Sequence, residues 1–324
     1  MKAAVIHAFG QPPRYEDFPE PTAGDGEVRV TVRAAGLHPV VRAMASGAHY
    51  TSSNVLPLIP GIDGVGSLDD GTRVYFGLSR PPYGTMAEYA VVPREMCFPI
   101  PDHLDDLTAA ALFNPAMSSW FVFTRTQLAQ GEIVLVLGAT GAAGKLAVQI
   151  AKNLGAGKVI ALGRNAQILS QLPQLGADVT ISLNQPEQDL IDAIARSASN
   201  SGIDVIIDYL WGHPTEMVIA ALARQGVTHS APRVRLIVTG QTAGPTISLP
   251  ASVLSSSGLE ISGSGIGTIS PERIRKEMPQ LIAKVASSNL HIDTEAVPLT
   301  EIEAVWQRQT TDNRRLVVFP RLYN

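Results

Sequence analysis

The chain has 324 residues, of which 45% are hydrophobic and only 17% charged, with 28 glycines and 23 prolines. This balance predicts a globular protein of about two domains and excludes disordered, collagen-like and coiled-coil chains. The net charge of −4 speaks against a nucleic-acid partner. The single cysteine, Cys97, excludes an internal disulfide and a four-cysteine zinc lobe, and it predicts a reducing compartment.

The first ten residues and the most apolar window predict no membrane partner. The first ten residues lack the long apolar core of a signal peptide. The most apolar window, 109–123, is interrupted by polar residues and is too short to cross a bilayer. We therefore expect a soluble, cytoplasmic protein.

The first hundred residues have the pattern of short strands separated by turns. Residues 28–33 alternate apolar and polar side chains, as a half-buried strand does, and a second strand is expected at 73–76 after Asp70-Gly71. Asp63 follows Pro60-Gly61 and is expected to cap a turn. This pattern of short strands and turns predicts a compact β-rich domain.

From about residue 117 strands and helices alternate. The apolar run 133–137 suits a strand covered on both faces, and an amphipathic helix follows it and ends near Gly155. The expected strands are 133–137, 159–162, 179–183, 205–210 and 234–239, and the later helices are 166–175, 187–198 and 215–224. Such units predict a parallel, doubly wound sheet.

After Gly240 the alternation stops. A strand at 259–261 leads into a glycine-rich stretch at 263–267. A helix is expected at 270–285 because Pro271 favours a first helical turn. A short helix at 301–306 and a strand at 316–319 complete the chain.

The strongest local signal is the glycine-rich turn at 138–144, GATGAAG, between a buried strand and an amphipathic helix. A dinucleotide fold requires small residues there, which Ala139, Gly141 and Gly144 supply, and the helix N-terminus offers free N–H groups to phosphates. Thr140, Ala142 and Ala143 complete the predicted cofactor-binding turn. A tight strand–helix junction without a ligand is the alternative.

The second strand of the alternating region ends at Gly163, Arg164 and Asn165, which we predict to bind the cofactor. An NADH site carries an acidic residue there, whereas arginine suits the 2′-phosphate of NADPH. The sequence therefore favours NADPH, and a solvated surface arginine is the alternative.

Eight stretches in this order resemble the zinc-independent quinone oxidoreductase branch of the medium-chain dehydrogenase/reductase superfamily. They are MKAAVI at 1–6, AGLHP at 35–39, SGAHY at 46–50, PGID at 60–63, GTMAEY at 84–89, GATGAAG at 138–144 with AVQIAKNLGA at 147–156, LGAD at 175–178 and ISGSGIG at 261–267. The resemblance implies an α/β fold in which a GroES-like β-rich catalytic domain (1–116 and 258–324) encloses a doubly wound Rossmann domain (117–257). It also implies a homodimer that pairs through the strand at 259–261.

The superfamily's zinc-ligand positions fall near His38, Ile62 and Asn114 in this chain. Isoleucine cannot bind zinc and an amide is a poor donor, so we expect no metal. Zinc-free chemistry suits quinones and α,β-unsaturated carbonyls, because conjugation carries charge away from the carbon that receives the hydride.

The resemblance also implies site residues outside the glycine-rich turn. His38 stands where the family commonly has a substrate-facing asparagine, and Tyr50 is placed beside the nicotinamide; both are predicted catalytic residues, with structural roles as the alternative. Asn114 is the predicted substrate-binding residue. The remaining predicted cofactor contacts are Ser118, Gly240, Gly265, Ile266, Gly267 and Arg314.

The sequence thus predicts an NADPH:quinone reductase-like enzyme. Two alternatives stay open, namely an enoyl-thioester or alkenal reductase of the same superfamily and an NADPH-binding protein without turnover.

Overall fold

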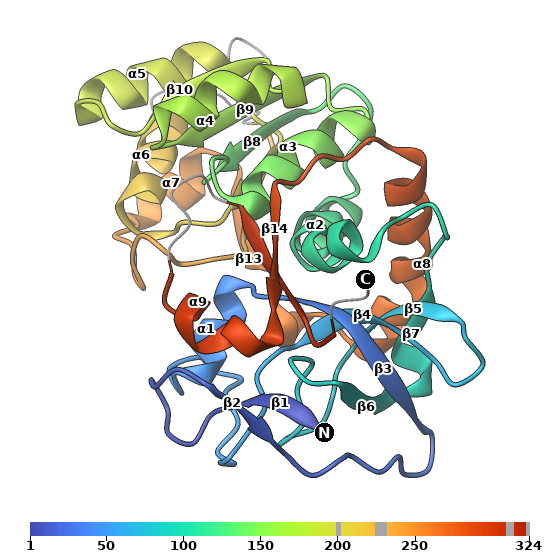
Figure 1. Cartoon of the computed structure of the whole chain (residues 1–324). Coiled ribbons are helices and arrows are strands. Elements are labelled where there is room, and N and C mark those ends of the chain that lie inside the picture. Colours follow the sequence, from blue (N-terminus) through green and yellow to red (C-terminus); the bar gives the residue numbers. More distant parts are fainter. Residues whose placement is uncertain (199–201, 224–231, 309–313, 322–324) are drawn as a thin grey trace. The chain divides into compact units, whose positions relative to one another are not determined.

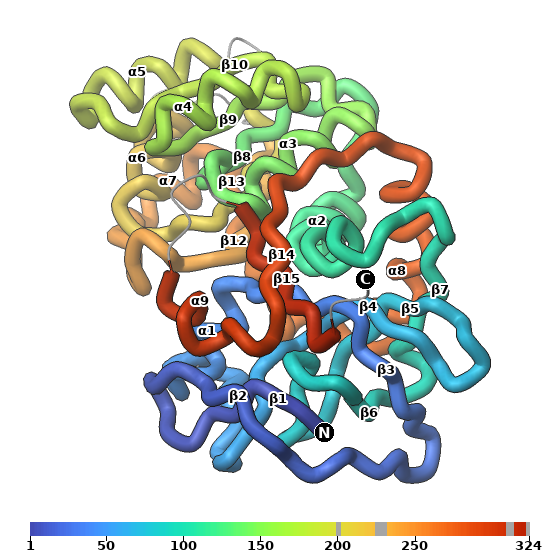
Figure 2. The backbone as a smooth tube through the Cα atoms, viewed as in Figure 1, coloured from blue at the N-terminus to red at the C-terminus, as the bar shows by residue number. Residues whose placement is uncertain are grey.

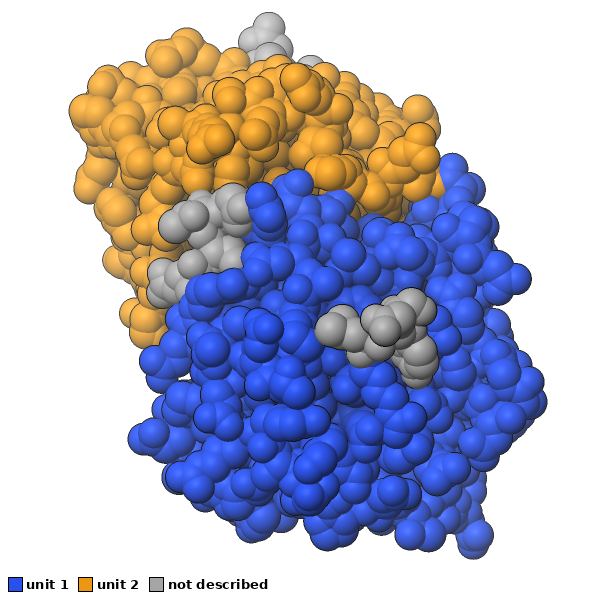
Figure 3. Space-filling view, viewed as in Figure 1, with its two compact units in different colours: residues 1–114, 275–287, 292–324 blue, residues 115–274, 288–291 orange. Residues whose placement is uncertain are grey.

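The computed structural model describes residues 1–198, 202–223, 232–308 and 314–321, and the chain forms two compact units (Figure 3). Unit 1 comprises Met1–Asn114, Arg275–Ser287 and Ile292–Asn324, and unit 2 comprises Pro115–Ile274 and Ser288–His291. The chain therefore passes from unit 1 into unit 2 and returns, as its trace shows (Figure 2). The predicted domain limits, 1–116 with 258–324 and 117–257, stay a prediction.

Unit 2 is built on a six-stranded, wholly parallel sheet with strand order β10-β9-β8-β11-β12-β13. Figure 1 labels four of these strands, β8, β9, β10 and β13. The elements of unit 2 in chain order are β8 (Ile133–Leu137), α3 (Ala142–Asn153), β9 (Lys158–Gly163), α4 (Ala166–Gln171), the 3₁₀ helix η2 (Leu172–Leu175), β10 (Val179–Ser182), α5 (Glu187–Ala198), β11 (Val205–Asp208), α6 (Gly212–Ala223), β12 (Val234–Val238), α7 (Ala251–Ser256), β13 (Leu259–Gly263) and η4 (Ile266–Thr268). This confirms the predicted doubly wound sheet.

Both faces of this sheet are covered, which explains the unbroken apolar strands. All five residues of β8 are buried, because α3 packs against β8 and β9 on one face while α5 and α6 pack together on the other. The strand order reverses at β8, whose neighbours are β9 and β11. The carboxyl ends of these three strands therefore form a topological switch point, where open α/β sheets bind ligands.

Several predicted element ends in unit 2 differ from the structure. The helix expected at 166–175 stops at Gln171 and continues as η2, because Pro173 has no N–H for the helical ladder. The strand expected at 205–210 ends at Asp208, whose carboxylate accepts the N–H groups of the next turn. The following helix begins at Gly212 rather than at residue 215, and residue 224 lies outside the described residues.

Unit 1 is dominated by a mixed sheet with strand order β14-β15-β3-β4-β5-β7, and β6 also pairs with β3. Its elements are β1 (Lys2–Val5), β2 (Arg14–Asp17), β3 (Glu27–Gly36), α1 (Pro39–Ala45), β4 (Asp63–Ser67), β5 (Arg73–Gly77), β6 (Tyr89–Pro93), η1 (Arg94–Met96), β7 (Cys97–Pro99), β14 (Thr294–Pro298), η5 (Leu299–Glu301), α9 (Ile302–Val305) and β15 (Arg315–Phe319). The predicted β-rich texture of the first hundred residues is confirmed.

Two long helices belong partly to each unit, α2 (Asp106–Thr126) and α8 (Pro271–Ser287). The apolar window at 109–123 lies within α2. In the part of the chain that the structure describes, no helix is both long and apolar enough to span a bilayer.

Candidate active site

The glycine-rich turn of unit 2 is tied to the end of the neighbouring strand. Gly138 has a φ of +93°, and its N–H and that of Ala139 both donate to Leu162 O of β9, at 3.0 and 2.8 Å. Gly141 N–H donates to Gly138 O at 3.1 Å and closes the turn. Ala139 is fully buried, so its small side chain serves packing beneath the turn.

Two glycines of the turn have different structural reasons. Gly144 has no room for a side chain, and Gly141 is the N-cap of α3. A Cβ on Gly144 would lie 2.2 Å from Gly138 O and 2.6 Å from Ala139 Cα, so no side chain fits between α3 and the turn. Gly141 is the N-cap of α3 and has no side chain to satisfy the first N–H groups of the helix, which belong to Ala142, Ala143 and Gly144. These donors and the positive end of the helix dipole suit an anionic ligand.

The end of β9 lies against the same turn. A Cβ on Gly163 would lie 2.3 Å from Thr140 Cγ2, so the two segments pack closely. Arg164 is exposed, and its backbone O accepts from Asn184 Nδ2 at 3.0 Å. The Asn165 side chain accepts from Ile168 N–H and caps α4, which gives this predicted cofactor residue a structural role as well.

The other predicted residues of unit 2 have different surroundings. Ser118 Oγ donates to Pro115 O at 2.6 Å and lies 3.0 Å from Tyr209 Oη. Gly240 lies two residues beyond the end of β12, and a Cβ there would lie 2.5 Å from Tyr209 O. Gly265, Ile266 and Gly267 form the start of η4, where Ile266 is 48% exposed, unusually high for a large apolar side chain.

Sequence reasoning missed Asp208 and Tyr209 at the switch point. Asp208 is buried and accepts from Leu210 N–H, Trp211 N–H and, at 2.6 Å, Thr215 Oγ1. Burial raises its pKa, while these three donors oppose the rise. An aspartate that ends an apolar strand at the carboxyl edge was the available signal.

In unit 1, His38 lies beside residues of the strands β3, β4 and β15. The β15–β3 register pairs Val317 with Gly36, so its continuation brings Arg315 opposite His38. The imidazole folds back over Gly36, where a Cβ would lie 2.3 Å from His38 Nε2. His38 is 1% exposed and is the N-cap of α1, although its side chain makes no capping hydrogen bond.

Asp63 is the first residue of β4 and is 3% exposed, so the expected turn-capping role is wrong. Its Oδ1 lies 3.2 Å from His38 Nε2. Tyr75 donates its hydroxyl to Asp63 Oδ2 at 2.6 Å. The contact follows from the register: Asp63 pairs with Gly77 on β5, and Tyr75, two residues away, shares that face of the sheet.

Burial perturbs the protonation of this cluster. It lowers the pKa of His38, the Asp63 carboxylate opposes the change, and the Arg315 charge adds to the lowering. Burial also raises the pKa of Tyr75 well above its usual value, so the phenol keeps its proton. Arg315 donates to Leu37 O at 3.1 Å, and burial lowers its pKa to about 10. The predicted contact Arg314 is exposed.

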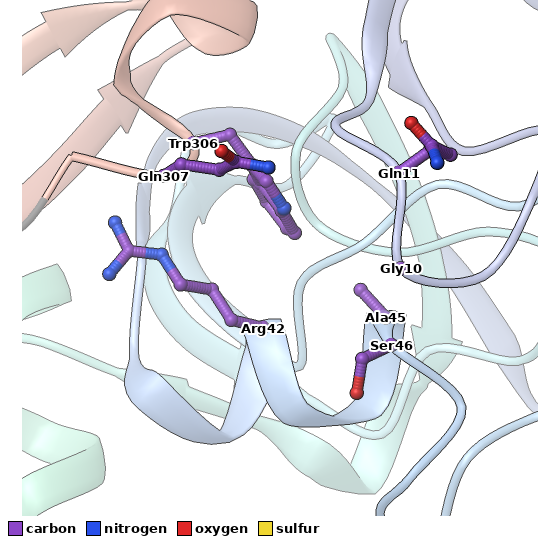
Figure 4. Close-up of a pocket in the computed structure, with 7 residues that line it drawn as sticks. All are labelled: Gly10, Gln11, Arg42, Ala45, Ser46, Trp306 and Gln307. Carbon is purple, nitrogen blue, oxygen red and sulfur yellow. The ribbon is translucent and has the colours of Figure 1, made fainter.

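The other predicted residues of unit 1, Tyr50 and Asn114, are more exposed than His38. Tyr50 is 71% exposed, and its ring stacks on His49 at a centroid distance of 4.3 Å. Asn114 is half-buried on α2. A pocket of about 280 Å³ opens between α1, the β1–β2 connection and the end of α9 (Figure 4), and none of the predicted site residues lines it; its walls are Gly10, Gln11, Arg42, Ala45, Ser46, Trp306 and Gln307.

Comparison with known proteins places this geometry in a family. The model of the zinc-binding dehydrogenase family matches residues 142–287. A probable NADPH-dependent quinone reductase of Emericella nidulans is 29% identical over 358 aligned positions, which cover 99% of this chain and 100% of that protein. The chain belongs to the medium-chain dehydrogenase/reductase superfamily.

Two further relatives agree with this assignment. The quinone oxidoreductase of Sus scrofa is 31% identical over 224 positions, which cover 65% of this chain and 66% of that protein. The crystal structure of the Thermus thermophilus quinone oxidoreductase, also solved with NADPH, superposes with a TM-score of 0.82 at 26% identity, covering 98% of this chain and 100% of that one. The predicted GroES-like and Rossmann architecture is confirmed, and the chain is a quinone oxidoreductase-like enzyme of this superfamily.

The matching family model is described as zinc-binding, but the donor set of this chain does not fit that metal. Among the described residues, no three His, Cys, Asp or Glu side chains come together as a metal site. Of the three superfamily ligand positions only His38 carries a strong donor, since the others hold Ile62 and Asn114. Cys97 is half-buried on β7, and burial raises its pKa to about 11, which disfavours the thiolate that binds zinc.

Proposed function

We propose that this enzyme transfers a hydride from NADPH to a quinone or an α,β-unsaturated carbonyl without zinc. The observation that carries the proposal is the switch-point site of unit 2, where the uncapped N-terminus of α3 and exposed Arg164 flank one turn. Backbone N–H groups suit the pyrophosphate, and a guanidinium suits a 2′-phosphate. The names of the relatives from Emericella nidulans and Thermus thermophilus support NADPH and quinone as substrates.

The glycine-rich turn fits a dinucleotide because its backbone can approach a ligand closely. Bound NADPH supplies a hydride at its nicotinamide C4. The chain's own contribution from unit 2 is to hold the phosphates through residues 141–144 and to select the phosphorylated ribose through Arg164. On unit 1, His38 is the proposed donor of a proton to the reduced acceptor, and Tyr50 and Asn114 are proposed to contact the nicotinamide and the substrate.

The donor set described above does not fit zinc, so no step of the proposal passes through a metal. A conjugated acceptor needs less electrophilic help than a simple alcohol or ketone, because its negative charge is delocalised as hydride arrives. Hydride transfer then depends on positioning and on hydrogen bonds to the acceptor oxygen. A cytoplasmic location and a homodimer through β13, an edge strand of its sheet, stay predictions.

The test measures binding and turnover of the full chain. Dissociation constants for NADPH and NADH are determined by calorimetry, and NADPH oxidation is followed with a panel of quinones and enones before and after treatment with a metal chelator. We expect tighter binding of NADPH, quinone- or enone-dependent oxidation, and no loss of rate on chelation. Tighter binding of NADH, the absence of turnover with every acceptor, or inactivation that added zinc reverses would each contradict the corresponding part of the proposal.

A further inference from the structure

The turn that follows β10 in unit 2 reaches the end of the neighbouring strand β9. The two strands are parallel, with Ser182 opposite Gly163, and Leu183 N–H donates to Gly163 O at 2.8 Å. One residue further along each segment, Asn184 Nδ2 donates to the backbone O of Arg164 at 3.0 Å. A side chain therefore joins the two strand ends beyond the last backbone hydrogen bond of the pair.

The Asn184 amide is directed at β9 by the turn in which it lies. Asn184 N–H donates to Ser182 Oγ at 3.1 Å, and Gln185 Nε2 donates to Ser182 O at 2.6 Å. Both bonds close the turn onto the end of β10. Because a carbonyl oxygen only accepts hydrogen bonds, the contact with Arg164 O requires the NH2 group of the amide.

Arg164 is held by its backbone on both sides as well. Before it, Gly163 packs against the glycine-rich turn, where a Cβ would lie 2.3 Å from Thr140 Cγ2. After it, Asn165 caps α4 by accepting Ile168 N–H at 3.1 Å. The bond from Asn184 fixes the one backbone acceptor of Arg164 between these two anchors. The backbone is thus fixed while the long side chain extends into solvent.

The composition of these two strand ends suits an anion. Neither residues 163–165 nor residues 182–185 include a carboxylate. Arg164 and Asn184 are exposed, and Arg164 forms no ion pair with a residue that the structure describes. A phosphate that approaches from solution therefore meets an available guanidinium and no opposing charge from these two segments.

We propose that Asn184 is a positioning residue that fixes the backbone of Arg164 and so contributes to the preference of this chain for a 2′-phosphorylated nucleotide. This inference rests on the proposed function, in which Arg164 binds the 2′-phosphate of NADPH. An arginine with a mobile backbone loses more conformational freedom when its guanidinium settles on a phosphate, and that loss weakens binding. Asn184 removes part of this cost before the ligand arrives. Because it acts through Arg164, a nucleotide without the 2′-phosphate gains nothing from it.

The first arm of the test measures the binding of two probes and needs no turnover. The full chain is titrated by calorimetry with adenosine 2′,5′-bisphosphate and with AMP, which lacks the 2′-phosphate. Wild type should bind the bisphosphate more tightly. Asn184→Ala should weaken bisphosphate binding about fivefold, the size of one hydrogen bond, and change AMP binding less than about twofold. Gln174→Ala, which removes another exposed amide of unit 2, on η2, is the matched control and should change neither.

The second arm asks whether Asn184 acts through Arg164. Asn184→Ala is combined with Arg164→Gln, and the bisphosphate is titrated into both single variants and the double variant. In the Arg164→Gln background the effect of Asn184→Ala should fall below about twofold, because no guanidinium is left to position. A merely structural role of Asn184 in the 182–185 turn would instead weaken AMP binding as well, and its effect would persist without the guanidinium.

The outcomes separate this inference from the proposed function. Equal changes for both probes in Asn184→Ala, no change for either, or a full effect in the Arg164→Gln background overturns the positioning role. If Asn184→Ala does not fold, Asn184→Leu decides by the same titrations, since it keeps a branched side chain of similar size and lacks the donor. A wild-type chain that binds both probes equally overturns the selection of NADPH by Arg164, and this inference with it. One that prefers the bisphosphate but reduces no acceptor overturns the reductase function alone.

Discussion

The glycine-rich turn of unit 2 and the His38 cluster of unit 1 are two opposite ways of building a site. The turn is contiguous, occupies residues 138–144, and offers mostly backbone N–H groups. The cluster brings together side chains from β4, β5, β15 and the β3–α1 connection, with Leu37 and Arg315 separated by 278 positions. Phosphate recognition needs backbone geometry that glycine spacing encodes, whereas proton chemistry needs side-chain proximity that only sheet register produces.

The two regions also differ in exposure. Gly141 and Arg164, which we propose to meet a charged ligand from solution, are exposed. His38, Asp63 and Tyr75 are buried. Burial lowers the pKa of His38 and raises the pKa of Tyr75, and the Asp63 carboxylate opposes the first change and adds to the second. We expect stability and cofactor binding at the glycine-rich turn to fall when a side chain adds volume or a charge is lost. We expect the His38 cluster to be sensitive to the loss of single polar atoms.

The largest effect is expected for Gly144→Val. Its Cβ would meet the backbone at Gly138 O and Ala139 Cα, so we expect a stability loss of about 3 kcal/mol or more and no measurable NADPH binding. Gly141→Ala is the matched variant, because its Cβ meets only Gly138 O, at 3.5 Å, and should cost less than about 1 kcal/mol. Denaturant unfolding and calorimetry measure both, and wild-type NADPH affinity in Gly144→Val would refute the close approach of helix and turn.

Gly36→Ala adds a side chain beside the His38 cluster, as Gly144→Val does in the glycine-rich turn. The new methyl group would lie 2.3 Å from His38 Nε2 and 2.7 Å from Ala110 O, so we expect a loss of about 2 kcal/mol and a displaced imidazole. Turnover should fall while the NADPH Kd stays the same, since unit 2 is not altered. In a double-mutant cycle with His38→Asn, the cost of the added methyl group should shrink; an equal cost in both backgrounds would show that His38 does not occupy this space.

Arg164→Gln removes a charge from the proposed nucleotide site and leaves the glycine-rich turn unaltered. Loss of a charge-assisted contact to the 2′-phosphate should weaken NADPH binding about tenfold, or about 1.4 kcal/mol, and leave NADH binding unchanged. Stability should not change, because Arg164 is exposed. Arg196→Gln, another exposed arginine of unit 2, is the control; equal losses for both cofactors would remove Arg164 from the choice between them.

The smallest effect concerns pH. Because the pKa of His38 is lowered in the folded state, the unfolded chain binds more protons below about pH 6.5, the usual value for histidine. Stability should therefore be constant above that pH and fall as the pH drops toward the lowered value, with a slope of at most about 1.4 kcal/mol per pH unit. Burial also lowers the pKa of the half-buried His49, which therefore contributes a pH dependence of the same sign. Comparing thermal unfolding of wild type and His38→Gln between about pH 7.5 and 5.5 isolates the contribution of His38, because both proteins keep His49. Parallel profiles would contradict the shift.

Sequence patterns predicted the parallel sheet well because its strands are buried on both faces and its helices are amphipathic. Their ends were less predictable, because Asp208 ends β11 with a side chain that accepts two backbone N–H groups of the next turn. Asp63 was misplaced for a related reason. After Pro60-Gly61 an aspartate is typical of a turn, and only the pairing with β5 shows that it begins a strand.

The amino-acid sequence alone was enough to identify the doubly wound unit, the glycine-rich turn and the family, because each depends on residues that are close together in the chain. It could not reveal that Asp63, Tyr75 and Arg315 surround His38, because sheet register brings residues of different strands together without a periodic signal. Burial lowers the pKa of this imidazole, the Arg315 charge adds to the lowering, and the Asp63 carboxylate opposes it. The folded unit therefore determines the acid–base chemistry available at a histidine that the sequence had only singled out.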